Sequence, residues 1–90
     1  MNTDRKKAFL RNLKKITDPA LKAEVEQVYA VVKAAKTMQE IPHLRKVEGC
    51  KKGISYRIRV GKYRIGVTIE DGMVTFKRFG HRDNFYKSFP

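Results

Sequence analysis

The chain has 90 residues, 41% of them hydrophobic, which allows one domain with a single modest core. It carries 21 Lys and Arg residues against 9 Asp and Glu, a formal net charge of +12 that is concentrated in residues 50–90. This charge indicates a nucleic acid, the ribosome or an acidic protein as partner. No apolar run could span a membrane and no secretory signal is present, so we expect no membrane partner. Cys50 is the only cysteine, and no ligand-type spacing predicts a metal site or another cofactor.

Two amphipathic helices are predicted in the first 36 residues. The first is expected to start at Thr3-Asp4 and to continue through apolar residues at helical spacing. The second is expected to begin with Asp18 as its N-cap and Pro19 in its first turn, where the missing N–H costs nothing. Its apolar stripe consists of Leu21, Val25, Val28, Val32 and Ala35. The short break at Thr17-Asp18 predicts an antiparallel helical hairpin.

The second half of the chain is predicted to form strands. Residues 37–53 read as a connector with a short strand at 44–47, and His43 as a surface loop residue. From Ile54 onward, apolar residues alternate with polar ones, which is typical of half-buried strands. Gly61-Lys62 predicts a type II′ hairpin turn and Asp71-Gly72 a type I′ turn, followed by a third strand over 73–79.

Two-residue turns fix which side chains face each other across the strands. Ile58 is expected opposite Ile65 and Val67 opposite Phe76, which creates one apolar face for the helices to cover. On the other face, the register predicts four facing pairs, Arg59–Arg64, Arg57–Gly66, Gly66–Lys77 and Arg64–Phe79.

Basic side chains thus gather around a glycine that has no side chain. Facing like charges cost about a few tenths to 1 kcal/mol per pair, and a multiply charged anion would remove this repulsion. Because arginine makes two parallel hydrogen bonds to phosphate, the pattern favours a shallow basic depression that binds phosphate groups. The alternative is a solvated polar face on which the long side chains splay apart.

The segment RFGHRDNFY after the third strand adds groups that can move protons. We expect Gly80 to let the chain turn there and bring His81, Arg82 and Tyr86 close to the basic face. Histidine transfers protons near neutral pH and tyrosine can donate a proton or stack on a base. With a phosphate site, these are the parts needed for metal-free RNA cleavage by a 2′-hydroxyl.

The segments YRIRVGKYRIG, EDG and FKRFGHRDNFY, in this order, resemble RelE/ParE-superfamily toxins of bacterial type II toxin–antitoxin systems, and the RelE-like branch most. The resemblance implies one α+β domain over residues 1–90, with the helical hairpin on one face of a three- to four-stranded antiparallel sheet. Family members often begin with an apolar strand, whereas MNTDRKKA is polar. Either that edge strand is missing here, or it is weak and short.

The resemblance also implies a function and a set of site residues. It implies a cytoplasmic toxin that is bound by a cognate antitoxin and that cleaves messenger RNA in the ribosomal A site. Well-studied RelE enzymes have lysine where this chain has Arg57 and Arg59, and arginine is a poor general base, so His81 is the expected base and Tyr86 the alternative. The expected catalytic residues are Arg57, Arg59, Arg64, His81, Arg82 and Tyr86, and the expected RNA- or phosphate-binding residues are Lys51, Lys52, Lys62, Lys77 and Phe79.

Two other functions remain open at this point. A ParE-like toxin would share the fold but inhibit DNA gyrase without cutting RNA. A basic module that binds nucleic acid without catalysis would explain the charge and the arginine-for-lysine change. Mapping of message cleavage and assays of gyrase inhibition would separate the three.

Overall fold

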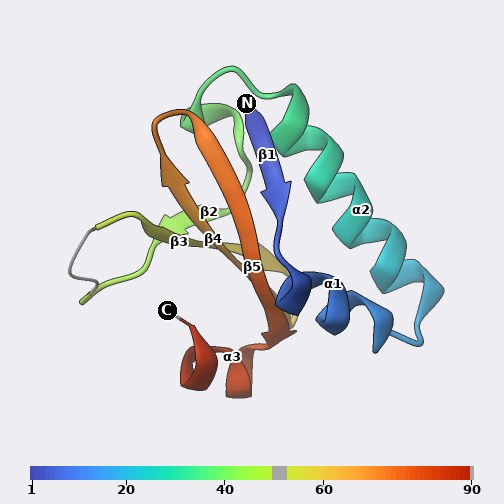
Figure 1. The fold of residues 1–90 in the computed structure, drawn as a ribbon. Helices are drawn as coiled ribbons and strands as arrows, with labels where there is room; N and C mark the ends of the chain where they lie inside the picture. Colours follow the sequence, from blue (N-terminus) through green and yellow to red (C-terminus); the bar gives the residue numbers. More distant parts are fainter. Residues whose placement is uncertain (50–52, 90) are drawn as a thin grey trace.

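The computed structural model describes residues 1–49 and 53–89. Two helices, α1 and α2, lie on one side of a central sheet, and a short third helix, α3, lies below it near the C-terminus (Figure 1). The predicted α+β class is therefore confirmed. In chain order the elements are β1 (Asn2–Arg5), α1 (Lys7–Lys14), α2 (Pro19–Ala34), the 3-10 turn η1 (Met38–Glu40), β2 (Leu44–Lys46), β3 (Ser55–Val60), β4 (Tyr63–Glu70), β5 (Met73–His81) and α3 (Arg82–Ser88).

The sheet has five strands in the order β1-β5-β4-β3-β2. β2, β3, β4 and β5 pair in antiparallel fashion, whereas β1 pairs with β5 in parallel. The expectation of three or four strands, all antiparallel, was wrong on both counts. The first strand accounts for both errors, because it is the added strand and also the parallel one.

The register of the central hairpins is the predicted one. Ile58 pairs with Ile65, Arg59 with Arg64, and Val67 with Phe76. The turn glycine Gly61 has φ 58°. At the second turn both residues of 71–72 have positive φ, 51° and 76°, as a type I′ turn requires. These tight turns hold the alternating side chains on their predicted faces.

A bulge in β5 changes the register beyond Phe76. Val67 still pairs with Phe76, but Gly66 pairs with Arg78, so Lys77 is the inserted residue. The predicted pairing of Gly66 with Lys77 was therefore wrong. The same shift places Phe79 opposite Ile65, not opposite Arg64. Phe79 consequently joins the buried core.

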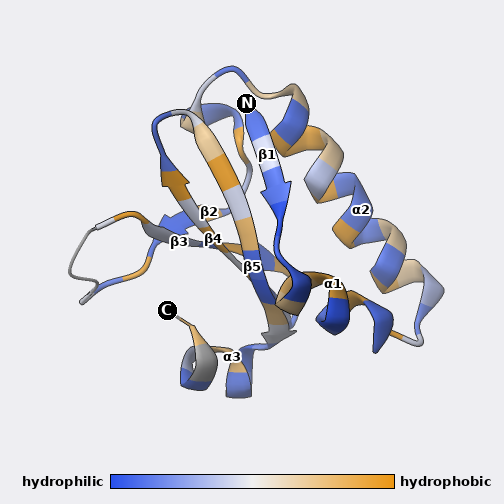
Figure 2. Ribbon diagram, viewed as in Figure 1, coloured by the Kyte–Doolittle hydropathy of each residue, from blue (hydrophilic) through white to orange (hydrophobic). Residues whose placement is uncertain are grey.

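The first strand is polar throughout, as its colour in Figure 2 shows. A helix start at Thr3-Asp4 was the wrong expectation, because residues 2–5 are extended and α1 begins only at Lys7. Of the two alternatives for an edge strand, a short strand is the one observed. Its side chains are bound to α2: Thr3 Oγ1 lies 2.9 Å from Tyr29 Oη, and the Arg5 guanidinium lies 4.3 Å from the centre of the Tyr29 ring.

The second helix has the predicted start and the predicted buried stripe. Asp18 Oδ1 accepts a hydrogen bond from Ala20 N–H at 2.9 Å, and Pro19 is the first helical residue. Of the stripe, Val25 and Val32 are fully buried in the main core. The core joins α1 and α2 to one face of the sheet, and it includes Phe9, Ile58, Ile65, Phe76 and Phe79.

The end of β5 differs from the sequence-based expectation. The strand does not turn at Gly80 but runs to His81, and α3 starts at the next residue. Asn12 Oδ1 of α1 accepts a hydrogen bond from Phe79 N–H at 3.0 Å, which satisfies the edge of β5 where β1 has ended.

Among the described residues, no helix is long and apolar enough to cross a membrane.

We predict that Phe76→Ala lowers the free energy of unfolding by about 3–5 kcal/mol. Phe76 is fully buried, and its ring lies 5.3 Å from that of Phe9 and 5.2 Å from that of Tyr29. Met73→Ala is the control, because Met73 begins the same strand and is 39% exposed; it should change stability by no more than about 0.5 kcal/mol. Urea unfolding measures both. Equal losses in the two variants would contradict this core.

Candidate nucleic-acid interface

Five arginines have register positions on the sheet face that α1 and α2 do not cover, and four of them lie on β2, β3 and β4. The register pairs Arg45 with Arg57, Arg57 with Gly66, and Arg59 with Arg64. We call Arg45, Arg57, Arg59 and Arg64 the basic face. The sequence analysis did not place Arg45 on this face, although it predicted the short strand at 44–47. Pairing that strand with residues 55–60 would have placed Arg45 opposite Arg57.

Two guanidinium groups of the basic face have hydrogen-bond partners elsewhere in the chain. Arg64 Nη1 donates to Gly61 O at 3.0 Å and to Tyr63 O at 2.9 Å. Arg59 Nη2 lies 3.4 Å from His43 Nδ1. Within residues 1–49 and 53–89, none of the four arginines forms an ion pair with an acidic side chain. Their charge is therefore available to an anion.

A groove of about 510 Å³ opens at the β2 edge of this face. His43, predicted to be a surface loop residue, is exposed but also borders the groove, where the backbone adopts φ 61°. Guanidinium groups that converge on one groove suit the phosphates of a single nucleic-acid strand. The groove is lined by Ile41, His43, Leu44, Arg45, Arg57 and Arg59.

The predicted depression around Gly66 is not present. Gly66 is buried, and a Cβ atom built there would lie 2.8 Å from the Phe89 ring and 2.9 Å from the Phe85 ring. Both rings come from the C-terminal segment, and with Val47 they form a second, smaller core cluster. The depression is thus filled by aromatic side chains, and the arginines lie around them.

Helix α3 carries two of the predicted catalytic residues onto this side of the sheet. Its first turn is held by the hydrogen bond from Arg82 N–H to Lys62 O, 2.9 Å long. The Arg82 side chain is 56% exposed and Tyr86 is 51% exposed. Phe85, beside Tyr86, is buried against Gly66, so the same short helix anchors one ring and presents the next residue to solvent.

His81 does not join the basic face. It pairs with Tyr63, which belongs to the helix-covered face, and its ring packs edge-on against Tyr63 at 5.4 Å. Its Nδ1 accepts a hydrogen bond from Asp83 N–H at 3.2 Å, so His81 is the N-cap of α3. The sheet therefore separates His81 from the arginines, and the lone pair of Nδ1 is already used.

The predicted RNA-binding residues are scattered. Lys62 is exposed in the turn after β3, and Lys77 is the half-buried bulge residue. Arg78, which stands opposite Gly66, donates to Lys77 O and borders a small cavity with Arg11 of α1, so it reaches the α1 side of the sheet edge. Lys51 and Lys52 lie outside the described residues.

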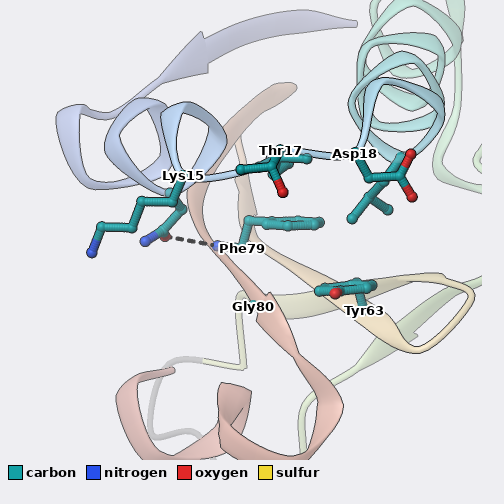
Figure 3. A pocket seen from close by; sticks show the side chains of 9 residues that line it. Lys15, Thr17, Asp18, Tyr63, Phe79 and Gly80 are labelled. Carbon is teal, nitrogen blue, oxygen red and sulfur yellow. Dashed lines mark hydrogen bonds between the residues drawn. The ribbon is translucent and has the colours of Figure 1, made fainter.

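Phe79 lies in the main core, away from the basic face. Its ring stacks on that of Tyr63, with 5.3 Å between centroids and 4° between planes. Figure 3 shows the two rings below the α1–α2 connection, beside a pocket of about 270 Å³. Apart from Phe79 itself, none of the predicted site residues lines this pocket. The expected contact of Phe79 with RNA on the basic face was therefore wrong.

The arrangement can bind and polarise a phosphate group and can transfer a proton. The arginines supply fixed positive charge, and the Tyr86 hydroxyl can donate or accept a proton. The described residues include no group of three or more His, Cys, Asp or Glu side chains that could hold a metal ion.

Known proteins have this fold and a sequence that is similar in part. No family model matches the chain. The sequence is 27% identical over 85 residues to toxin RelE3 of Methanocaldococcus jannaschii, covering 93% of each chain. In the RelB–RelE antitoxin–toxin complex from Methanococcus jannaschii, one chain matches with a TM-score of 0.79 and 25% identity, over 97% of this chain and 99% of that one.

A chain of the archaeal RelE–RelB complex from Pyrococcus horikoshii OT3 has the same fold, with a TM-score of 0.70 and 18% identity over 90% of this chain and 93% of that one. By sequence and fold, the chain is similar to RelE toxins of toxin–antitoxin systems, which confirms the resemblance found in its sequence.

We predict that Arg59→Gln weakens binding of a short single-stranded RNA and lowers the slope of log affinity against log salt by about 0.7, the value for one lost phosphate contact. The variant should not be less stable at low salt, because it removes the like-charged partner of Arg64. Lys22→Gln, an exposed lysine of α2, removes the same charge and should leave the slope unchanged. Equal slopes for all three proteins would contradict an RNA contact at Arg59.

Proposed function

We propose that the protein is the toxin of a toxin–antitoxin pair and cleaves messenger RNA on the ribosome. The observation that carries this proposal is the placement of α3, with Arg82 and Tyr86, on the same side of the sheet as four arginines that lack acidic partners. A protein that only binds RNA needs the charge but has no need of a proton-transfer group beside it.

The proposed reaction is an internal phosphoryl transfer that needs no metal ion. The 2′-hydroxyl of one nucleotide loses its proton and attacks the adjacent phosphorus. The bond to the 5′-oxygen of the next nucleotide breaks, and that oxygen takes up a proton. The products are a 2′,3′-cyclic phosphate and a 5′-hydroxyl. The basic face stabilises the charge that builds up on the phosphoryl oxygens.

Tyr86 is the better candidate for proton transfer. Arginine stays protonated and cannot serve as a general base. His81 was the expected base, but it lies with Tyr63 and uses Nδ1 to cap α3. We therefore assign His81 the role of holding the first turn of α3, and assign proton transfer to Tyr86. Arg82, exposed on that turn, would contact the phosphate.

The proposed partners follow from the charge and from the relatives. A net charge of +12 suits the RNA-rich surface of the ribosome. The two solved relatives described above are complexes of RelE with RelB, the first an antitoxin–toxin complex. We propose a cognate antitoxin for this chain as well, and the cytoplasm, where ribosomes translate, as its location.

The test is single-turnover cleavage of a message on purified, programmed ribosomes. Tyr86→Phe should slow cleavage about 10²–10⁴-fold, because it removes a proton-transfer group. Arg82→Ala should slow it about 10²–10³-fold, because it removes charge stabilisation. His81→Ala should cost about 1 kcal/mol of stability through the lost cap and should retain most of the cleavage rate.

Lys22→Gln is the control and should cleave as the wild type does. A Tyr86→Phe variant with full activity, together with an inactive but folded His81→Ala variant, would reverse the assigned roles. Wild-type protein that leaves ribosome-bound messages intact and inhibits DNA gyrase would replace the proposed function with a ParE-like one. Binding of RNA without either activity would leave a non-catalytic module.

A further inference from the structure

Gly66 is a glycine for steric reasons. It lies in the middle of β4 and does not have positive φ, so its backbone conformation is open to any residue. What excludes a side chain is the lack of room above Gly66. A Cβ atom would stand 2.8 Å from Cγ and Cδ1 of Phe89 and 2.9 Å from Cζ of Phe85, closer than carbon atoms approach without repulsion.

Helix α3 depends on this contact for its position. Phe85 and Phe89 are 2% and 4% exposed, and with Val47 they form a cluster separate from the main core. A backbone hydrogen bond from Arg82 N–H to Lys62 O also ties the first turn of α3 to the β3–β4 turn. An isolated seven-residue helix such as α3 is not stable in water. Its order therefore comes from packing on the sheet.

A second glycine provides a comparison within the same sheet. Gly80 lies in β5, pairs with Arg64 and also lacks positive φ. A Cβ atom built at Gly80 would meet nothing within 4 Å. The same glycine-to-alanine change therefore meets two phenylalanine rings at Gly66 and open space at Gly80.

We propose that Gly66 is a positioning residue, whose missing side chain lets Phe85 and Phe89 hold α3 close to the sheet and so places Tyr86 beside the basic face. The functional part of this inference rests on the proposed RNA cleavage. An alanine at Gly66 lifts the two rings, since the backbone of a central strand cannot retreat from them. The main core lies on the opposite face of the sheet and keeps its packing.

Amide hydrogen exchange measured by NMR tests the structural half without any assay of activity. In Gly66→Ala, amides of α3, including Phe89 N–H, which donates to Phe85 O at 3.1 Å, should exchange at least about fivefold faster, as expected for overpacking of a buried contact. Amides of β3, β4 and β5 should keep their wild-type protection. Gly80→Ala should match the wild type throughout. Wild-type protection of α3 in Gly66→Ala would overturn the inference.

A double-mutant cycle on the ribosome tests whether Gly66 acts through Tyr86. Gly66→Ala should slow cleavage while Gly80→Ala does not, and Gly66→Ala with Tyr86→Phe should be no slower than Tyr86→Phe alone. Losses that multiply in the double variant would overturn the link to Tyr86. If the wild type does not cleave RNA, the proposed function fails, while the exchange experiment still decides whether Gly66 positions α3.

Discussion

The register of the β3–β4–β5 meander is the constraint on which the rest of this structure depends. Two-residue turns at 61–62 and 71–72 fix it, and a shift by one residue would exchange the two faces of every strand. In the observed register the apolar residues meet α1 and α2, so the alternating arginines must gather on the other face. The repulsion between Arg59 and Arg64 is thus a consequence of burying Ile58 and Ile65.

The centre of the face that carries the arginines is not left open to water. Two phenylalanines of the C-terminal segment cover its centre at Gly66, where the lack of a side chain makes room for them. The two faces of the sheet therefore have different roles. One side carries the main core, and the other combines fixed positive charge with a helix that presents Tyr86. An RNA phosphate bound there would offset the cost of bringing like charges together.

Sequence patterns predicted those features of the fold that depend on interactions between residues close together in the chain. The cap at Asp18, the turn glycines and the pairing of Arg59 with Arg64 follow from neighbouring residues alone. The sequence left open whether the first strand was missing or short, because polar side-chain contacts to α2, such as Thr3 with Tyr29, hold it instead of an apolar pattern. The bulge at Lys77 and the packing of α3 on Gly66 depend on contacts between distant segments. For that reason the sequence placed the arginines of β3 and β4 on one face, as the structure has them, but it missed Arg45 and expected His81 close to that face.

The most direct test of the basic face as an RNA site is NMR mapping of a bound single-stranded RNA whose 2′-hydroxyls are replaced by hydrogen, so that it cannot be cleaved. The side-chain Nε–H signals of arginine report on each guanidinium separately. We predict that the signals of Arg57, Arg59 and Arg64 shift together at low salt and return as salt is added, while α2 is unaffected. Shifts confined to the lysines of α1 and α2, with unchanged arginine signals, would contradict an RNA site on this face.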